Sequence, residues 1–442
     1  MTSDPPSPPE DARSARVARA ALVPVPAQAL AALRRRTTAV LVVSQILGGL
    51  GVTIGITVGT VLARRVGGSD ALAGLAPTAT VAGTALLSLP MAALTGARGR
   101  RPGLVLGYLV GGLGALVVVA AARAGNFPLL LCGMAAFGGA SSANLQARFA
   151  AADLAEPRQR ARAISHVVWA TTVGAVVGPN IAAPAGRSVA GVGTPEEAGP
   201  FLWAAVTFLL CAGVVGVLLR PDPLLTARAY APPEEVSAGT RSLRAGVAAA
   251  AASPRARLAL VTVTVSHTAM VSVMAMTPVD LAHHGAGIEL IGLVISGHIA
   301  GMYAFSPLMG RLADRVGRLS VIGLAAGLLA GALFLAGTAG GDHRQTAAGL
   351  FVLGLGWSAG LVAGSALLTD SVPTSARAAA QGLSDLVMNT SAGVGGIVAG
   401  LVVARAGYGW LNAGAACLLV PLAGLVLLGR VRRAGGADPE TG

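Results

Sequence analysis

The 442-residue sequence contains no lysine, and only 12% of its residues are charged, which is about half the share found in ordinary soluble proteins. Its 32 basic residues are therefore all arginines, and they outnumber the 19 acidic residues to give a formal net charge of +13. Without lysine the chain has no nucleotide-binding loop of the G-x4-G-K-[ST] type. This absence excludes ATP-driven transport by this chain alone. The sequence also leaves no room for a soluble catalytic domain, so an enzyme is not expected.

Cysteine is also scarce, and its positions exclude further kinds of site. Cys132, Cys211 and Cys417 each fall inside an apolar run, where neither a loop disulfide nor a metal cluster is expected. No metal and no cofactor is therefore predicted. The N-terminal residues MTSDPPSPPEDARSARVARAALVPVP lack the apolar centre of a signal peptide. We expect disordered cytoplasmic tails over residues 1–37 and 431–442.

Long apolar runs are what the sequence does contain. Hydrophobic residues make up 54% of the chain, and the mean hydropathy is +0.71. Residues 38–63 form a run of 26 without a charge, and about 20 apolar residues suffice to cross a bilayer. The pattern predicts an all-α integral membrane protein. Its twelve transmembrane helices are expected at residues 38–63, 71–95, 103–122, 127–147, 163–184, 199–219, 258–281, 288–309, 319–339, 346–368, 379–403 and 410–429.

The arginines predict how these helices cross the membrane. One long polar connection, residues 220–257, divides the chain into bundles of six helices over residues 38–219 and 258–430. If both termini lie in the cytoplasm, 26 of the 32 arginines fall on the cytoplasmic side and six fall outside. Arginine and lysine are enriched in the cytoplasmic loops of membrane proteins. We therefore expect both termini, and the linker between the bundles, in the cytoplasm.

The two halves of the chain repeat each other at an offset of 217 or 218 residues. The stretch MAALTGARGRR of residues 91–101 aligns with MGRLADRVGRL of residues 309–319. Farther along, two matching sets of loop charges follow at the same offset, which are Asp153 with Arg160 and Asp370 with Arg377. Two six-helix repeats in parallel orientation are a known transporter architecture.

The stretch MGRLADRVGRLS is predicted to form the short cytoplasmic turn between the eighth and ninth helices. Gly310 and Gly317 permit a tight reversal and a close helix approach. Asp314 can pair with Arg311, Arg315 or Arg318, or can lie at a helix N-terminus, where a negative charge is favourable. The spacing G-x-L-A-D-R-x-G-R resembles the cytoplasmic loop signature of the major facilitator superfamily, and the resemblance extends over residues 38–430.

The resemblance implies a secondary transporter with twelve helices in two pseudo-symmetric bundles. In that family the loop signature is usually better preserved in the first half. Here Gly96 stands in the first half where Asp314 stands in the second. We therefore expect the stronger charge latch in the second half.

The predicted fifth helix carries a second motif. Gly174 and Gly178 lie one turn apart and offer a smooth face for close helix packing. Pro179 leaves a backbone carbonyl unpaired and favours a kink. The motif resembles one associated with the proton-coupled antiporters, the exporter branch of the superfamily, although Ala182 and Ala183 stand where that motif ends in glycines. An ordinary glycine-rich packing face is the alternative.

Ionisable side chains inside membrane helices are costly and mark functional sites. Three candidates for proton coupling lie in the second half, which are Asp385, His298 and His267. Gln381 and Asn389 lie one turn to either side of Asp385, so the three residues form one polar stripe. The structural alternatives are a pairing of Asp385 with Arg377 and, for each histidine, a hydrogen bond to a neighbouring helix.

These features together predict a transporter that exports a small neutral or cationic amphipathic compound in exchange for protons. The predicted fourth helix, residues 127–147, contains no basic residue, and the mid-membrane region offers no arginine to hold an anion. The substrate should bind between the halves, and their rocking would give alternating access. The candidates for lining that cavity are Gln381, Asn389, Gln45, Asn144 and Trp169.

An importer or facilitator of a small metabolite would share this fold and remains an alternative, as does a non-transporting receptor. The expected partners are the small-molecule substrate, protons and the lipid bilayer, with no nucleic acid. The expected form is a monomer, and the expected location is the cell membrane of a bacterium.

The topology can be tested with single cysteines placed in residues 220–257. We expect them to react with membrane-impermeant thiol reagents from the cytoplasmic side only, because the arginines hold this linker inside. Labelling from outside intact cells would contradict the predicted topology.

Overall fold

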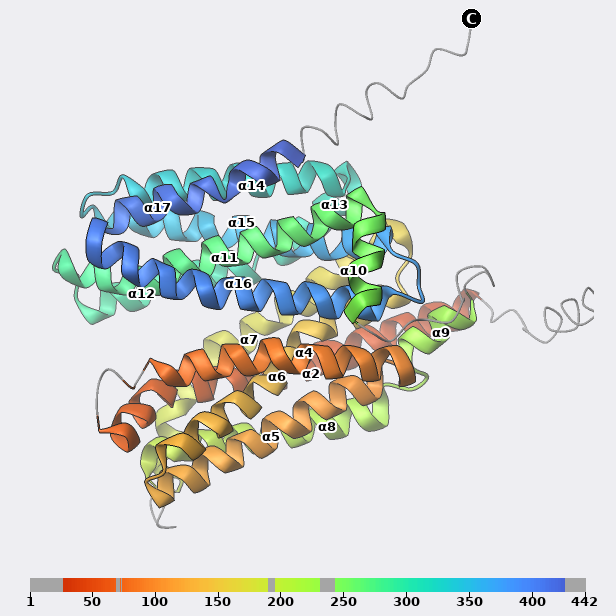
Figure 1. The fold of residues 1–442 in the computed structure, drawn as a ribbon. Helices are drawn as coiled ribbons and strands as arrows, with labels where there is room; N and C mark the ends of the chain where they lie inside the picture. The colour runs from red at the N-terminus through yellow and green to blue at the C-terminus, as the bar shows by residue number, and fades with distance from the viewer. Residues whose placement is uncertain (1–26, 69–71, 73, 190–194, 231–242, 426–442) are drawn as a thin grey trace, which may run out of the picture.

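Two bundles of long helices lie side by side in the computed structural model, which describes residues 27–68, 72, 74–189, 195–230 and 243–425. Figure 1 shows one bundle in red to yellow-green and the other in green to blue. Eleven helices in the described part are long and apolar enough to span a membrane, and a bent helix pair makes a twelfth. The predicted all-α membrane fold is confirmed.

The first half consists of α2 (Ala27–Gly67), α4 (Leu75–Arg98), α5 (Arg100–Ala124), α6 (Phe127–Asp153), α7 (Arg160–Arg187) and α8 (Gly199–Leu218). The second half consists of α11 (Pro254–His283), α12 (Ile288–Tyr303), α13 (Ser306–Val316), α14 (Arg318–Gly337), α15 (His343–Ser371), α16 (Arg377–Ala406) and α17 (Tyr408–Cys417). The short helices α9 (Pro223–Ala229) and α10 (Leu243–Ala252) lie between the halves in sequence. Single 3-10 turns, η1 (Pro157–Gln159) and η3 (Glu196–Ala198), precede α7 and α8.

Local sequence explains where several helices begin. Four of them start at a side chain that accepts hydrogen bonds from the free backbone N–H groups of the first turn. These capping residues are Asn126 for α6, Asp222 for α9, Ser253 for α11 and Asp342 for α15.

The helices extend beyond the predicted ranges at the polar ends. α2 begins at Ala27, inside the segment predicted to be a disordered tail, because the run AQALAALRRR consists of strong helix formers. The predicted linker likewise contains α9 and α10. The remaining parts of the predicted tails and linker, residues 1–26, 231–242 and 426–442, lie outside the described residues.

The loop signature differs from its prediction in one respect. α13 continues to Val316, so Gly310 and Asp314 lie in a helix, and only Gly317 forms the turn. Its φ of 93° matches the φ of 94° at Gly99, the aligned glycine in the first half. This left-handed conformation suits glycine, so each half uses one glycine to reverse the chain at the same place.

Glycines also bring helices together where a side chain would collide. A Cβ on Gly310 would lie 2.2 Å from Ser165 Oγ on α7, so α13 and α7 meet across the halves. Within the first half, a Cβ on Gly174 would lie 2.5 Å from the backbone of Gly49 on α2. α7 then bends by 52° between Gly178 and Asn180, where the sequence places Pro179.

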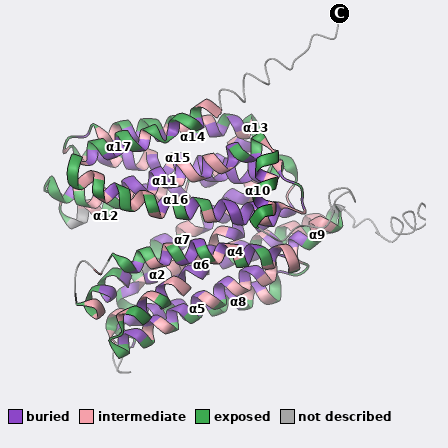
Figure 2. Ribbon diagram, in the orientation of Figure 1, coloured by how far each residue is buried: buried purple, intermediate pink, exposed green. Residues whose placement is uncertain are grey.

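We call the end of the molecule that carries α9, α10 and the turns α4–α5, α6–α7, α13–α14 and α15–α16 the arginine-rich end. There α4 packs along α16 and α7 along α13, while the axes of the bundles diverge toward the opposite end (Figure 1). Exposed residues follow the outer faces of both bundles (Figure 2). They include large apolar side chains such as Leu113, Phe334 and Trp410, as expected for helices that face lipid.

The helix packing can be tested with Gly83→Val in α4, because a Cβ there would lie 1.8 Å from the carbonyl oxygen of Ala135 on α6. We expect a loss of stability of at least about 1–3 kcal/mol from overpacking, measured as a lower thermal unfolding midpoint in detergent. Gly331→Val in α14 is the matched control, since its Cβ would meet nothing within 4 Å. Equal midpoints for the two variants would contradict the packing.

Candidate functional site

The two halves are joined at the arginine-rich end by hydrogen bonds and ion pairs. We call this set the inter-half closure. It contains an outer layer at the turns, centred on Asp314 and Asp370, and a deeper layer in which Arg148 meets Asp385. The hydrogen bonds between the halves include those of both layers and one more, from Arg100 to Gln381.

Asp314 of α13 caps α7 of the other half. Its carboxylate accepts hydrogen bonds from the backbone nitrogens of Ala161 at 3.2 Å and Arg162 at 2.9 Å. These N–H groups belong to the first turn of α7, where they have no partner within the helix and where the helix dipole favours a negative charge. Arg318 adds an ion pair at 2.7 Å. The carboxylate therefore makes both interactions that the sequence suggested, while Arg315 is exposed.

Asp370, at the end of α15, receives arginines from both halves. Arg160 of α7 approaches it at 2.5 Å, and Arg318 approaches it at 3.3 Å. Arg318 also donates to the carbonyl oxygen of Pro157 at 2.5 Å. Asp153 and Arg160, the matching loop charges of the first half, therefore do not pair with each other, because Arg160 reaches across to the second half.

The first half has a related but different arrangement. Arg100, aligned with Arg318, forms an ion pair with Asp153 at 2.7 Å, and both side chains are buried. Arg100 also donates to the amide oxygen of Gln381 on α16. At Gly96, which aligns with Asp314, an added Cβ would lie 3.7 Å from the Cβ of Ala378, just inside the start of α16. The acidic cap of the second half thus has no counterpart here.

Helix α9 compensates for part of that difference. Asp222 accepts a hydrogen bond at 2.8 Å from the backbone nitrogen of Arg101, in the first turn of α5. Arg228 donates to the carbonyl oxygen of Gly96 at 2.8 Å. The first-half turn is therefore held by the start of the linker, whereas the second-half turn is held by the opposite half.

The deeper layer is a buried ion pair between α6 and α16. Arg148 Nη2 lies 2.7 Å from Asp385 Oδ1, and neither residue is more than 1% exposed. Arg148 also donates to Ser365 Oγ at 3.1 Å and to the carbonyl oxygen of Leu145 at 2.6 Å. The other carboxylate oxygen, Asp385 Oδ2, is buried and accepts no hydrogen bond from the described residues.

This pair corrects two predictions. The fourth helix was predicted over residues 127–147, which left Arg148 outside it, but α6 continues to Asp153 and buries the arginine. Pairing of Asp385 with Arg377 is also wrong, because the carboxylate faces the first half. The helix-forming run LQARFAAAD could have indicated the longer helix, but the partner of Arg148 lies 237 residues away.

The predicted polar stripe on α16 faces the first half. Gln381 bonds Arg100 and also donates to Thr369 Oγ1 at 3.2 Å. Asn389 donates to the carbonyl oxygen of Asp385, its own helix neighbour, at 2.8 Å. All three stripe residues are buried.

The two candidate histidines lie within the second half. His298 is fully buried, and its Nδ1 bonds the carbonyl oxygen of Leu350 on α15 at 2.8 Å. His267 of α11 accepts a hydrogen bond at its Nδ1 from the indole nitrogen of Trp357 at 2.9 Å. Trp357 was not identified from the sequence, since a tryptophan in an apolar run carries no distinguishing pattern.

The remaining cavity candidates belong to the first half. Gln45 donates to Thr171 Oγ1 at 2.9 Å, and Asn144 accepts from the hydroxyl of Tyr108 at 2.9 Å. Trp169 is 42% exposed on α7. The described hydrogen bonds do not join these residues to His267 or to Asp385.

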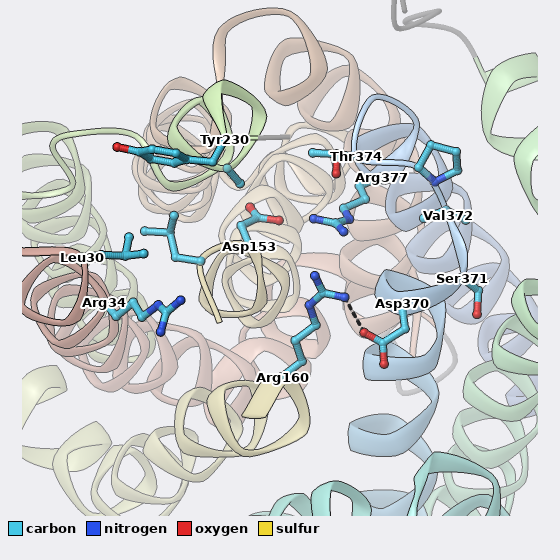
Figure 3. Close-up of a pocket in the computed structure, with 13 residues that line it drawn as sticks. Leu30, Arg34, Asp153, Arg160, Tyr230, Asp370, Ser371, Val372, Thr374 and Arg377 are labelled. Carbon is cyan, nitrogen blue, oxygen red and sulfur yellow. Dashed lines mark hydrogen bonds and ion pairs between the residues drawn. The ribbon is translucent and has the colours of Figure 1, made fainter. Parts of the chain in front are cut away.

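A cavity of about 610 Å³ opens at the arginine-rich end, beside the outer layer of the closure. Figure 3 shows Arg160 reaching from the first half to Asp370 of the second, with Arg34, Asp153, Tyr230 and Arg377 around them. Because both halves line this cavity, any separation of the halves at this end would widen it.

The sequence model of the Major Facilitator Superfamily matches residues 40–279 and 258–442. The chain belongs to the major facilitator superfamily. This member is 37% identical over 396 residues to the uncharacterized MFS-type transporter YddS of Bacillus subtilis, covering 89% of this chain and 91% of that protein. It is 30% identical over 329 residues to the riboflavin transporter RfnT of Brucella anthropi, covering 73% of this chain and 78% of that protein.

Solved structures support the same fold for this superfamily member. The human organic anion transporter MFSD10 superposes with a TM-score of 0.72 at 17% identity, covering 89% of this chain and 99% of that one. The proton:xylose symporter XylE gives the same TM-score and identity, covering 90% and 96%. At these identities the similarity establishes the architecture and leaves the substrate open.

The asymmetry of the closure can be tested by opposite substitutions at aligned positions. Asp314→Asn removes the charge that caps α7, and we expect it to favour separation at the arginine-rich end by about 1–2 kcal/mol, or 5- to 30-fold. Gly96→Asp supplies the missing charge beside α16 and should favour closure. Distances between spin labels at exposed positions Arg98 and Val316 would report both shifts. Identical distance distributions in both variants and the parent would contradict a latch.

Proposed function

We propose that the protein is a secondary transporter that exports a small organic compound in exchange for protons. The observation that carries the proposal is the buried Arg148–Asp385 pair, because it joins the two halves through a group that can be neutralised by one proton. Major facilitator proteins transport by alternating exposure of a site between their halves.

The arginine-rich end is proposed to face the cytoplasm, following the distribution of arginines in the sequence. With the inter-half closure formed, the described conformation then corresponds to a transporter closed toward the cytoplasm. Opening toward the cytoplasm must break both layers of the closure, and any change that weakens them shifts the population toward that state.

A proton on Asp385 is such a change. Protonation removes the charge that compensates Arg148, and a buried arginine without its partner is unfavourable by several kcal/mol. A proton that arrives from outside would therefore favour opening toward the cytoplasm, where a hydrated Asp385 could release it. Formation of the Arg148–Asp385 pair would then favour the return with bound substrate. This order moves protons inward and substrate outward.

The proposed substrate is neutral or cationic and amphipathic. Arg148 is engaged by Asp385, Ser365 and a backbone carbonyl, so the pair contributes no net positive charge to attract an anion. The Gly174, Gly178 and Pro179 motif, with its bend in α7, supports the export direction by its resemblance to the antiporter branch.

Transport of a metabolite is the second candidate function, in either direction. The similarity to the riboflavin transporter of Brucella anthropi favours it and makes riboflavin one of the compounds to test. Loss of uptake in cells that lack the protein would indicate import, whereas intracellular accumulation of the compound would indicate export.

Proton coupling can be tested with Asp385→Asn in proteoliposomes. We expect the variant to lose the stimulation of flux by an imposed pH gradient, because the amide cannot exchange a proton, while substrate binding is retained. A panel of cationic amphipathic compounds and riboflavin would supply the substrate. Asp370→Asn, a carboxylate of the outer layer, is the matched control and should keep the pH response.

Asp385→Asn leaves Arg148 buried without a counter-charge, at a cost of about 3–5 kcal/mol. The double variant Arg148→Gln/Asp385→Asn removes that charge and should recover part of the thermal stability without recovering the pH response. Normal pH-driven flux in either variant would exclude Asp385 from coupling.

A further inference from the structure

Three aromatic rings meet near the middle of the second half. His267 of α11 and Trp357 of α15 lie with ring centroids 6.1 Å apart, and Tyr303 at the end of α12 packs edge-on to Trp357 at 5.5 Å. Trp357 is buried, while His267 and Tyr303 are both partly exposed. The ring of His267 is thus partly exposed beside two aromatic rings.

The hydrogen bond from Trp357 determines the chemical form of His267. An indole N–H can only donate, so Nδ1 of the histidine, 2.9 Å away, must act as the acceptor and carry no proton. A neutral imidazole with a free Nδ1 carries its proton on Nε2. A doubly protonated ring could not accept this bond at all. His267 is therefore held as a neutral donor through Nε2.

The surroundings of His267 agree with a neutral ring. Arg148 is the buried cation of the first half. That arginine is paired with Asp385 on α16, and Tyr303 is the ionisable neighbour on α12. The other titratable groups of α11 lie at its ends, with Arg255 and Arg257 in the first turn and Asp280 and His283 in the last. The described neighbours thus offer no free carboxylate to stabilise a second proton on the ring.

The Nε2 atom is not among the buried polar atoms that lack a partner, in contrast to Nε2 of His298. Nor do the described residues provide a hydrogen bond to it. A partly exposed donor with a fixed orientation, beside the partly exposed ring of Tyr303, is suited to a ligand that brings both an acceptor and an apolar surface.

We propose that His267 is a specificity-determining residue that donates a hydrogen bond from Nε2 to the transported compound, and that Trp357 positions it. The ligand class is a neutral compound that carries a hydrogen-bond acceptor, such as a ring nitrogen or a carbonyl, on or beside an aromatic ring. The proposal rests on the proposed transport function at one point, because it takes the ligand of His267 to be the transported substrate. It also assigns His267 a role other than proton carrier.

The tautomer can be measured without any ligand. The chain has six histidines, and ¹⁵N-histidine NMR of the full-length protein in nanodiscs distinguishes a protonated Nε2 from a protonated Nδ1. His267→Gln identifies the resonance. We expect the Nε2–H form alone in the parent, and a mixture of tautomers in Trp357→Phe, which keeps the ring but removes the donor. Trp203→Phe, which removes an indole N–H bonded to Ser188 in the first half, is the matched control. An Nδ1–H form or a charged ring in the parent would overturn the proposal.

The ligand class can be measured with quinoline and naphthalene, which have the same shape and differ by one ring acceptor. We expect quinoline to shift the His267 Nε2 resonance and to bind about 3- to 10-fold more weakly to His267→Phe, as for the loss of one hydrogen bond. Naphthalene binding should not change. His267→Gln, which retains an N–H donor, should recover quinoline binding. An equal response to both compounds would overturn the proposal, and the result does not depend on whether flux is coupled to protons.

Discussion

The ion pair between Arg148 and Asp385 is the interaction on which the described conformation depends. Two opposite charges are buried in a region that excludes water, and each is tolerable there only because the other is 2.7 Å away. Since the arginine belongs to α6 and the carboxylate to α16, the two helices must approach for either charge to be compensated. Gly310 against α7 and Gly382 against α4 are further close contacts between the same two halves.

Around this pair the two halves have the same backbone turns, but different side chains hold those turns in place. Gly99 and Gly317 turn the chain in the same way, and the Arg100–Asp153 and Arg318–Asp370 pairs lie at aligned positions. Among the described residues of the two aligned turns, Asp314 caps a helix of the opposite half, whereas Gly96 stands at the aligned position. In the first half the corresponding turn is held by α9 instead. The α4–α5 turn and the α13–α14 turn are therefore held by different contacts, so the two need not separate from their partners equally easily.

The fold could be predicted from the sequence because it depends on local properties. Run length, the absence of charge and the arginines at helix ends indicate the helices, and the repeat indicates the two halves. The predicted helix ends were less accurate, as at Ala27 and Val316. Ala, Leu and Arg are good helix formers, so a helix can continue through them beyond the apolar run. The position of Asp385 in a polar stripe was likewise visible in the sequence.

The partners of the site residues could not be predicted, because they are set by tertiary distance. Nothing in the sequence near Asp385 indicates Arg148, and nothing near His267 indicates Trp357, 90 residues farther along. The stripe on α16 indicated that polar groups of another helix must face it, but only the structure identifies them as Arg148 of α6 and Arg100 at the start of α5.

The lack of lysine has a consequence for how the closure responds to its surroundings. Every cationic side chain in the closure is a guanidinium, which keeps its proton at any pH that a cell experiences. The positive charge in each contact thus does not change with pH. The two hydrogen bonds from Arg100 to Asp153 also fix the orientation of that guanidinium. Within the closure, only the carboxylates can therefore change their charge when the pH falls, so its response to acid depends on these few groups.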